Sequence, residues 1–588
     1  MKKDWRKTQQ HLIPGKKPKF PGENYDIYPS FKLKDNQIFS GFESLAAEIK
    51  KHRIVIIDGY IGVFFDRFRK VLDIHLKKQG ATTVWKTTSD YYKPPDHIKE
   101  MISPFLGEDD PLFGKRINLN LEDFFDTPRL KALSPDSEAD ITLIIGPGAA
   151  LTDWKGLLVY IDLPKNELQF RSRAGSVTNL GATTSTDPKE MYKRFYFVDW
   201  IVLNKHKRSI LKAVDLFVDG QRPESPFWMN GGLLRHSLTV MSHNLFRVRP
   251  WFEPGTWGGT WIMDHIGGLN KEVANYAWSF ELIVPENGLL FESSGMMLEV
   301  SFDCLMFMEG EAVLGDCFPR FGTDFPIRFD FLDTFDGGNL SVQCHPRPDY
   351  MKNHFGENFT QEETYYIIDT KDNAIVYLGF QNNIDPSHFR KTLETSYQKS
   401  EPVDLEKFVQ RHNASKHDLF LIPFGTIHGS GKNNLVLEIS STPYIFTFKM
   451  YDWLRPDLDG KPRPLNIQRG MNNLFFDRKG PWVKDNLISH PALIDKGEGW
   501  QLYHLPTHET HLYDVHRFHI KNSIDVRTEN KFHVLNLVEG SSIIVETLNG
   551  ISQEFNYAET FIIPASACSY RITNKSDNEA VVIKAFVK

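Results

Sequence analysis

The chain has 588 residues, of which 41% are hydrophobic and 24% are charged, and its formal net charge is −6. These values are typical of globular proteins, and the weakly acidic balance gives no reason to expect nucleic acid or an anionic membrane as a partner. A chain of this length is expected to fold as about two to four domains. No stretch is long and apolar enough to span a bilayer, and the basic N-terminus leads into polar residues, so we expect a cytoplasmic protein that binds no membrane.

Residues 1–235 have the pattern of an α/β domain with a parallel sheet. The segments 53–59, 141–148 and 156–163 contain apolar runs next to Gly or Pro, which is typical of buried strands. Residues 64–76 have the apolar spacing of a helix. Strands that alternate with helical segments predict a parallel sheet.

This segment resembles P-loop nucleoside kinases such as uridine kinase. A strand, a Gly-rich turn and a helix come first, and Arg171-Ser172-Arg173 stands where such kinases carry lid arginines. A phosphate loop has the order Gly-x4-Gly-Lys-Ser/Thr, but counted from Gly59 the corresponding positions hold Phe64-Phe65-Asp66. No lysine is there to hold a phosphate, and the aspartate would repel one. We therefore predict a degenerate, noncatalytic domain with a structural, regulatory or assembly role; the alternative is an active kinase.

The stretch 220–232 contains two prolines and a Gly pair, and it predicts the boundary between two halves. Beyond it, short strand-like runs separated by Gly, Asn, Asp and Pro predict all-β barrels of the cupin type with an accessory helical and loop segment. We expect a metal-binding barrel domain over residues 240–490. A second, smaller and metal-free barrel is expected over residues 495–588, where two runs are similar to the strand-and-turn signatures of cupins.

The most informative constellation is Gln343, His345, Glu363 and His428. Side chains two apart in a strand point to the same face, so Gln343 and His345 can reach one ion. Two imidazoles, a carboxylate and an amide oxygen suit zinc or a similar divalent ion, with room for a substrate oxygen. The plainer alternative is a hydrogen-bonded core histidine before Pro346 and a solvated strand start at Glu363.

The order and surroundings of these residues resemble the class I mannose-6-phosphate isomerases, which are zinc-dependent enzymes with the cupin fold. The resemblance covers about residues 245–588, and its further motifs are Trp257-Gly258-Gly259, Phe325-Pro326 and Tyr451-Asp452-Trp453-Leu454-Arg455. It implies that one zinc ion is held by Gln343, His345, Glu363 and His428.

The resemblance also implies an activity, the interconversion of mannose 6-phosphate and fructose 6-phosphate through an enediol. The ion would act as a Lewis acid on the carbonyl and hydroxyl oxygens, and a positioned base would move the proton. From the family pattern we expect Glu438 as the base, with Arg455 and Lys449 as electrostatic partners. The alternative for Glu438 is a strand carboxylate that pairs with Lys449 or Arg455. The expected partner is a sugar or sugar phosphate.

The chain departs from the family pattern at three positions, of which two lost lysines affect the phosphate site and one arginine is credited with helping proton transfer. The family's lysine in the strand before the metal strand is Asp330 here, the lysine near the metal carboxylate is Gln361, and the arginine before Tyr-Asp is Lys449. A phosphate dianion needs charge-assisted partners, and a carboxylate would repel it. Arg347 and Arg455 are candidates to compensate. Two alternatives therefore stand: a metal-binding cupin that acts on another, unphosphorylated sugar, and a noncatalytic sugar-sensing or regulatory protein.

Overall fold

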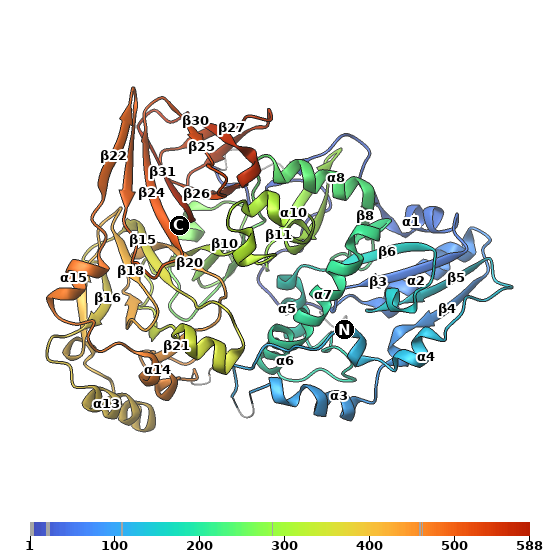
Figure 1. The fold of residues 1–588 in the computed structure, drawn as a ribbon, viewed down its shortest axis with the longest axis horizontal. Coiled ribbons are helices and arrows are strands. Elements are labelled where there is room, and N and C mark those ends of the chain that lie inside the picture. The colour runs from blue at the N-terminus through green and yellow to red at the C-terminus, as the bar shows by residue number, and fades with distance from the viewer. Residues whose placement is uncertain (1–4, 19–23, 108–109, 285, 458–459, 461–462) are drawn as a thin grey trace.

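The computed structural model describes residues 5–18, 24–107, 110–284, 286–457, 460 and 463–588. They form an α/β part and a β-rich part, which lie side by side (Figure 1). Among the described residues, no helix combines the length and the apolar run that crossing a bilayer requires.

The α/β part contains a seven-stranded sheet with the order β2-β8-β7-β6-β3-β5-β4. The five strands from β7 to β4 are parallel, and β8 and β2 are antiparallel at one edge. The strands are β2 (Phe39–Ser40), β3 (Ile54–Gly59), β4 (Thr83–Thr87), β5 (Ile141–Ile145), β6 (Leu157–Asp162), β7 (Leu216–Asp219) and β8 (Phe227–Asn230).

Side-chain alternation along β3 explains why helices cover both faces of this sheet. Val55 and Ile57 pack in a core with α1 and α2, whereas Ile56 lies in the core on the opposite face with α5 and α7. The helices of this part are α1 (Gly41–Ile49), α2 (Phe65–Lys78), α3 (Pro95–Ile102), α4 (Thr127–Lys131), α5 (Lys165–Arg173), α6 (Pro188–Arg194) and α7 (Trp200–Ile210).

The phosphate-loop positions of a kinase would fall in the turn between β3 and α2, which begins at Phe65. Asp58, near the end of β3, is buried and accepts hydrogen bonds from the backbone N–H groups of Gly148 at 3.0 Å and Ala150 at 2.9 Å. It also lies 2.8 Å from His206 Nε2. Protein groups therefore satisfy the polar end of this strand, and the relationship to kinases stays a prediction.

The β-rich part begins with two sheets from residues 251–451, which we call the first barrel. One has the order β18-β15-β20-β13-β10-β9 and the other β17-β16-β19-β14-β21. The strands are β9 (Trp251–Glu253), β10 (Trp278–Leu282), β13 (Ile327–Asp333), β14 (Val342–Cys344), β15 (Glu363–Thr370), β16 (Ile375–Phe380), β17 (Val409–Asn413), β18 (Leu419–Ile422), β19 (His428–Ser430), β20 (Asn434–Ser441) and β21 (Phe448–Tyr451). Its longer helices are α13 (Pro386–Lys399), α14 (Ile467–Asn473) and α15 (Pro481–Leu487).

Two further antiparallel sheets, β22-β23-β24-β31-β26-β29 and β25-β30-β27-β28, form the second barrel. Its strands are β22 (Ala492–Gly497), β23 (Trp500–Leu505), β24 (Tyr513–Ile520), β25 (Ser523–Arg527), β26 (His533–Glu539), β27 (Ser542–Thr547), β28 (Ser552–Asn556), β29 (Thr560–Ile563), β30 (Ser569–Asn574) and β31 (Ala580–Val587). The paired sheets are consistent with cupin-like domains.

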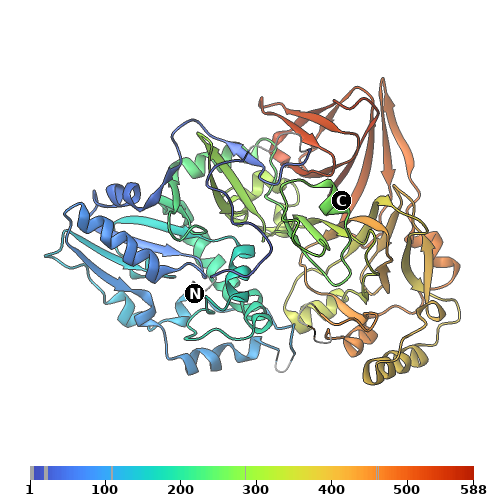
Figure 2. The ribbon, with the colours of Figure 1, turned by 180° about the vertical axis from the view of Figure 1, so that it is seen from behind.

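A small sheet joins the two parts. β1 (Ser30–Lys32) pairs in parallel with β11 (Gly288–Ser293), which pairs with β12 (Met296–Ser301), and α8 (Gly231–Ser242) packs on α10 (Asp303–Leu314). The backbone N–H of Asp26 donates to Glu559 of the second barrel at 2.6 Å. The N-terminal segment therefore packs on the β-rich part, and Figure 2 shows it in dark blue against the green strands. The domain limits given above stay predictions.

A buried network of two lysines and two aspartates connects the parts. Lys207 Nζ lies 2.8 Å from Asp162 Oδ1 and 2.7 Å from Asp303 Oδ1, and Lys165 Nζ lies 2.7 Å from Asp303 Oδ2. None of the four side chains is more than 5% exposed. Burial acts to raise the pKa of Asp303, but the two lysines outweigh it and lower that pKa to about 2. The burial of these two ammonium and two carboxyl groups depends on their mutual neutralisation.

We expect Lys207→Met to destabilise the docked arrangement, because it leaves Asp162 and Asp303 with one lysine between them. Removing one partner of a buried ion pair costs about 3–5 kcal/mol, so calorimetry should show the first unfolding transition at least about 5 °C lower. Arg208→Met removes an exposed charge from the same helix and should shift the transition by less than about 2 °C. Equal shifts in the two variants would contradict the proposed importance of the network.

Candidate metal centre and adjoining cavity

The two sheets of the first barrel bring the predicted ligands together. Gln343 on β14 pairs with His428 on β19, and His345 follows β14 immediately. Glu363 is the first residue of β15, in the other sheet. Ligand atoms of His345, Glu363 and His428 lie within 4.8 Å of one another, and all three side chains are buried. We call these three residues the His–Glu–His cluster.

Backbone carbonyls select the tautomer of both histidines. His345 Nδ1 lies 3.0 Å from the carbonyl oxygen of Phe446, and His428 Nδ1 lies 2.9 Å from that of Thr426. A carbonyl oxygen only accepts, so each Nδ1 carries a hydrogen and donates it. In the neutral rings each Nε2 then has a free lone pair, which is the form that binds a metal.

The nitrogen and oxygen atoms that face one another in the cluster are suited to bind a cation. His345 Nε2 lies 2.9 Å from Glu363 Oε1, and His428 Nε2 lies 3.4 Å from Glu363 Oε2. The lone pairs on the two Nε2 atoms repel the oxygens of the carboxylate unless a proton or a metal ion lies between nitrogen and oxygen. His345 Nε2 and Glu363 Oε2 have no hydrogen-bond partner among the described residues. A divalent ion would satisfy all of these atoms.

The pKa shifts of the two histidines also indicate a site for a cation. Burial lowers the pKa of His428, which favours its neutral form. Burial acts in the same direction on His345, but the carboxylate of Glu363 outweighs it and raises that pKa. The carboxylate thus attracts a positive charge to the position between the rings, and a metal ion can take the place of the proton.

Gln343 borders the cluster. Its Nε2 lies 3.3 Å from His428 Nε2, and its Oε1 accepts a hydrogen bond from Ser341 Oγ at 3.0 Å. A half-turn of the amide exchanges its oxygen and nitrogen and directs the oxygen at the cluster. Gln343 can therefore supply the amide ligand that the family pattern implies.

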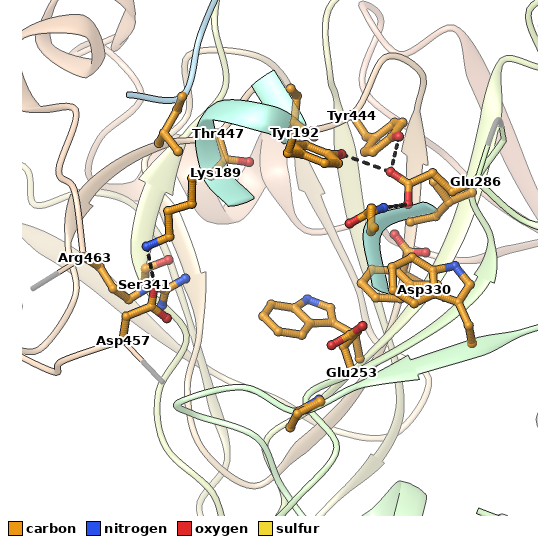
Figure 3. A pocket seen from close by; sticks show the side chains of 18 of the residues that line it. Lys189, Tyr192, Glu253, Glu286, Asp330, Ser341, Tyr444, Thr447, Asp457 and Arg463 are labelled. Carbon is orange, nitrogen blue, oxygen red and sulfur yellow. Dashed lines mark hydrogen bonds and ion pairs between the residues drawn. The ribbon is translucent and has the colours of Figure 1, made fainter. Parts of the chain in front are cut away.

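A cavity of about 1040 Å³ adjoins the cluster (Figure 3). Gln343 and Glu363 line it, together with side chains from α5 and α6 of the α/β part. Small-molecule sites typically have volumes of roughly 300–1000 Å³. The cavity is thus large enough for a small polar ligand and is lined by both parts of the molecule.

Two acids and an arginine line the cavity beside the cluster. Glu438 on β20 and Asp330 on β13 are cross-strand partners. Arg328 Nη2 lies 2.8 Å from Glu438 Oε1 and 3.4 Å from Asp330 Oδ2. Burial, followed by the charge of Glu363, raises the pKa of Glu438 to about 7, and burial also raises the pKa of Asp330. Glu438 can therefore gain and lose a proton near neutral pH.

The two other predicted catalytic residues lie in different surroundings. Lys449 on β21 is the cross-strand neighbour of Gln343 and lines the cavity. Burial, followed by the charge of Arg463, lowers the pKa of Lys449 to about 8. Arg455 is absent from the described residues that line the cavity, and its Nη2 lies 2.8 Å from Asp452 Oδ1. Arg463 lies 2.9 Å from the other oxygen of Asp452 and does line the cavity.

Sequence reasoning missed Arg328 and Arg463. Arg328 lies two positions before Asp330 on one face of β13, so strand alternation could have identified it as a cation near the lost lysine. No local pattern distinguishes Arg463. Arg347, one of the two candidates to compensate, donates to backbone carbonyls at the end of α14.

We expect His345→Ala to weaken zinc binding by more than about 100-fold, because even the loss of an outer partner of a ligand costs about 10–100-fold. His354→Ala, an exposed histidine in the connection between β14 and β15, is the matched control and should bind zinc like the unaltered protein. Competition with a chromophoric chelator measures the affinities. Equal affinities of the two variants would exclude the cluster as the zinc site.

The site therefore belongs to the class of candidate metal centres: a buried His–Glu–His cluster that could hold a metal ion lies between antiparallel sheets, beside a cavity that a small molecule can enter. Residues 41–243, in the α/β part, match a family described as "Domain of unknown function (DUF8485)". About half of the chain is similar to isomerases.

The chain is 27% identical over 326 residues to "Probable mannose-6-phosphate isomerase GmuF" of Bacillus subtilis (strain 168). The matched region covers 55% of this chain and 94% of that protein. It is 24% identical over 297 residues to "Mannose-6-phosphate isomerase ManA" of the same organism, over 50% of this chain and 86% of that protein. The crystal structure of the mannose 6-phosphate isomerase from Bacillus subtilis covers 58% of this chain and 99% of its own, with 20% identity and a TM-score of 0.48. The named relatives support an isomerase.

Proposed function

We propose that the chain is a zinc-dependent aldose–ketose isomerase that interconverts mannose 6-phosphate and fructose 6-phosphate. The observation that carries the proposal is the His–Glu–His cluster, whose lone pairs face one another next to Glu438 at the wall of a cavity lined by charged and aromatic side chains. The relatives named as mannose-6-phosphate isomerases support the same reaction.

Four residues would hold the ion: Gln343, His345, Glu363 and His428. Two imidazoles, one carboxylate and one amide oxygen suit zinc, and the cavity gives a substrate oxygen access to the remaining position. When bound, the ion supplies Lewis-acid polarisation of the carbonyl and neighbouring hydroxyl oxygens of the sugar. The protein's own residues have to place the sugar and move one proton between adjacent carbons.

Glu438 is the proposed base. It takes the proton from C2 of the aldose and returns it to C1, while the hydroxyl proton on O2 passes to O1, so that the ketose is an isomer of the aldose. Arg328 Nη2 and Ser440 Oγ both donate to Glu438 Oε1 at 2.8 Å. They orient the carboxylate, and we assign the proton transfer to Oε2.

A second candidate is a metal-dependent isomerase of an unphosphorylated sugar. Asp330 favours it, because this buried carboxylate lines the cavity where the family pattern implies a lysine. A carboxylate there disfavours a phosphate. Gln361, at the second lost lysine, donates its amide to Glu363 Oε1 at 2.6 Å and adds no positive charge.

An assay of zinc-loaded protein with mannose 6-phosphate and with mannose separates the two candidates. We expect turnover of the phosphorylated sugar, and its loss in His345→Ala with His354→Ala as the active control. Turnover of mannose alone would favour the second candidate. Absence of turnover with either sugar, in protein that holds one zinc per chain, would contradict both candidates and favour a noncatalytic sugar-binding protein.

Glu438→Gln should lower kcat by about 10²–10⁴-fold, because general acid–base catalysis contributes roughly that factor. The amide keeps the shape of the side chain but cannot accept the proton. Zinc content and the affinity for mannose 6-phosphate should remain near those of the unaltered protein. A kcat within about threefold of the unaltered value would assign Glu438 to a structural role beside Arg328.

A further inference from the structure

One wall of the cavity comes from α5 and α6, which lie within the segment matched by the domain of unknown function. Tyr192 OH donates to Glu286 Oε1 at 3.0 Å, and the amide of Gln169 donates to Glu286 Oε2. Tyr444, from the β-rich part, donates to the same carboxylate. Glu286 is buried, and its partners come from both parts. The α/β part is therefore held in a defined position over the cavity.

Lys189 extends from this wall along one edge of the cavity. Its Nζ lies 3.0 Å from Asp457 Oδ2. Figure 3 shows Lys189 beside Arg463 and Ser341, on the side away from Tyr192. The side chain is 48% exposed, so a molecule in the cavity can contact it.

Two more cations lie at this end of the cavity. Lys449 is the cross-strand neighbour of Gln343, and Arg463 Nη1 lies 2.9 Å from Asp452 Oδ2. The charges of Arg463 and Lys189 both act on Lys449, so the three cations lie within electrostatic reach of one another. Because Gln343 borders the His–Glu–His cluster, the cationic end is adjacent to the candidate metal centre.

Carboxylates and a half-exposed lysine meet at this end of the cavity. Asp457 is its ion-pair partner, and Asp187 caps α6 by accepting from the backbone N–H of Lys189 at 2.9 Å. An ion pair whose ammonium group is half exposed is weaker than a buried one. A lysine has a flexible four-carbon stem, and a phosphate dianion offers it twice the charge of a carboxylate.

We propose that Lys189 determines substrate specificity by binding the anionic group of the sugar, so that the α/β part adds a cation to those that the β-rich part supplies. The proposal rests on the isomerase function proposed above. The cation comes from α6, whereas the family pattern implies lysines at Asp330 and Gln361. Lys189 recognises a dianion attached to the sugar, with Lys449 and Arg463 as its neighbours.

Kinetics of Lys189→Met in the full chain test the proposal. We expect KM for mannose 6-phosphate to rise about tenfold, with a much smaller change in kcat, because a group that binds a remote charge acts alike on ground and transition states. Lys189→Arg keeps the charge and should recover most of the affinity. Lys212→Met, which removes an exposed lysine of the same part away from the cavity, is the matched control and should leave KM unchanged.

Calorimetric titration with mannose 6-phosphate and with mannose separates failure of this proposal from failure of the isomerase function. Absence of turnover together with a tenfold weaker affinity of Lys189→Met for the phosphorylated sugar alone would support the role of Lys189 and overturn the isomerase function. Turnover by the unaltered protein with the same KM in Lys189→Met would overturn the role of Lys189. Equal loss of affinity for both sugars would also overturn the role of Lys189, because that result indicates that the substitution distorts the cavity wall formed by α5 and α6.

Discussion

The charge balance between Lys165, Lys207, Asp162 and Asp303 is the constraint on which the arrangement of this molecule depends. Asp162 belongs to β6 of the α/β part, and Asp303 begins α10 next to the β-rich part. Isolated buried charges are strongly unfavourable, so these groups can remain out of water only while the two parts are docked. Docking brings α5 and α6 against the first barrel. The cavity beside the metal centre therefore depends on ion pairs that do not line it.

Much of the local structure follows from the sequence. The apolar runs that contain Val55, Leu143 and Val159 form β3, β5 and β6, because buried parallel strands need apolar side chains on both faces. The arrangement of the N-terminal segment could not be obtained in this way. Its strand β1 has three residues, and nothing in Ser30–Lys32 specifies β11 as the partner. Such pairing is determined by tertiary packing over a long sequence separation.

The candidate centre shows the same division. Spacing within one strand places Gln343 and His345 together, and the family pattern adds Glu363 and His428. The surroundings were harder to foresee, because they are assembled from separate regions. Arg463 lies beyond the isomerase-like motif that ends at Arg455, and Tyr192 and Lys189 belong to the other half of the chain. A pattern read along one segment contains no information on which distant helix covers it.

The parallel pairing of β1 with β11 affects the order in which the chain can fold during synthesis. Ser30 and Glu292, which hydrogen-bond across this sheet, are 262 positions apart. At about 5–20 residues per second, the ribosome needs roughly 13–50 s to make the intervening chain. During that time β1 has no partner, whereas all strands of the α/β sheet, from β2 to β8, are made within the same interval. The segment before β2 therefore waits as unpaired chain, and an exposed strand edge of this kind is where a nascent protein is open to mispairing or to capture by a chaperone.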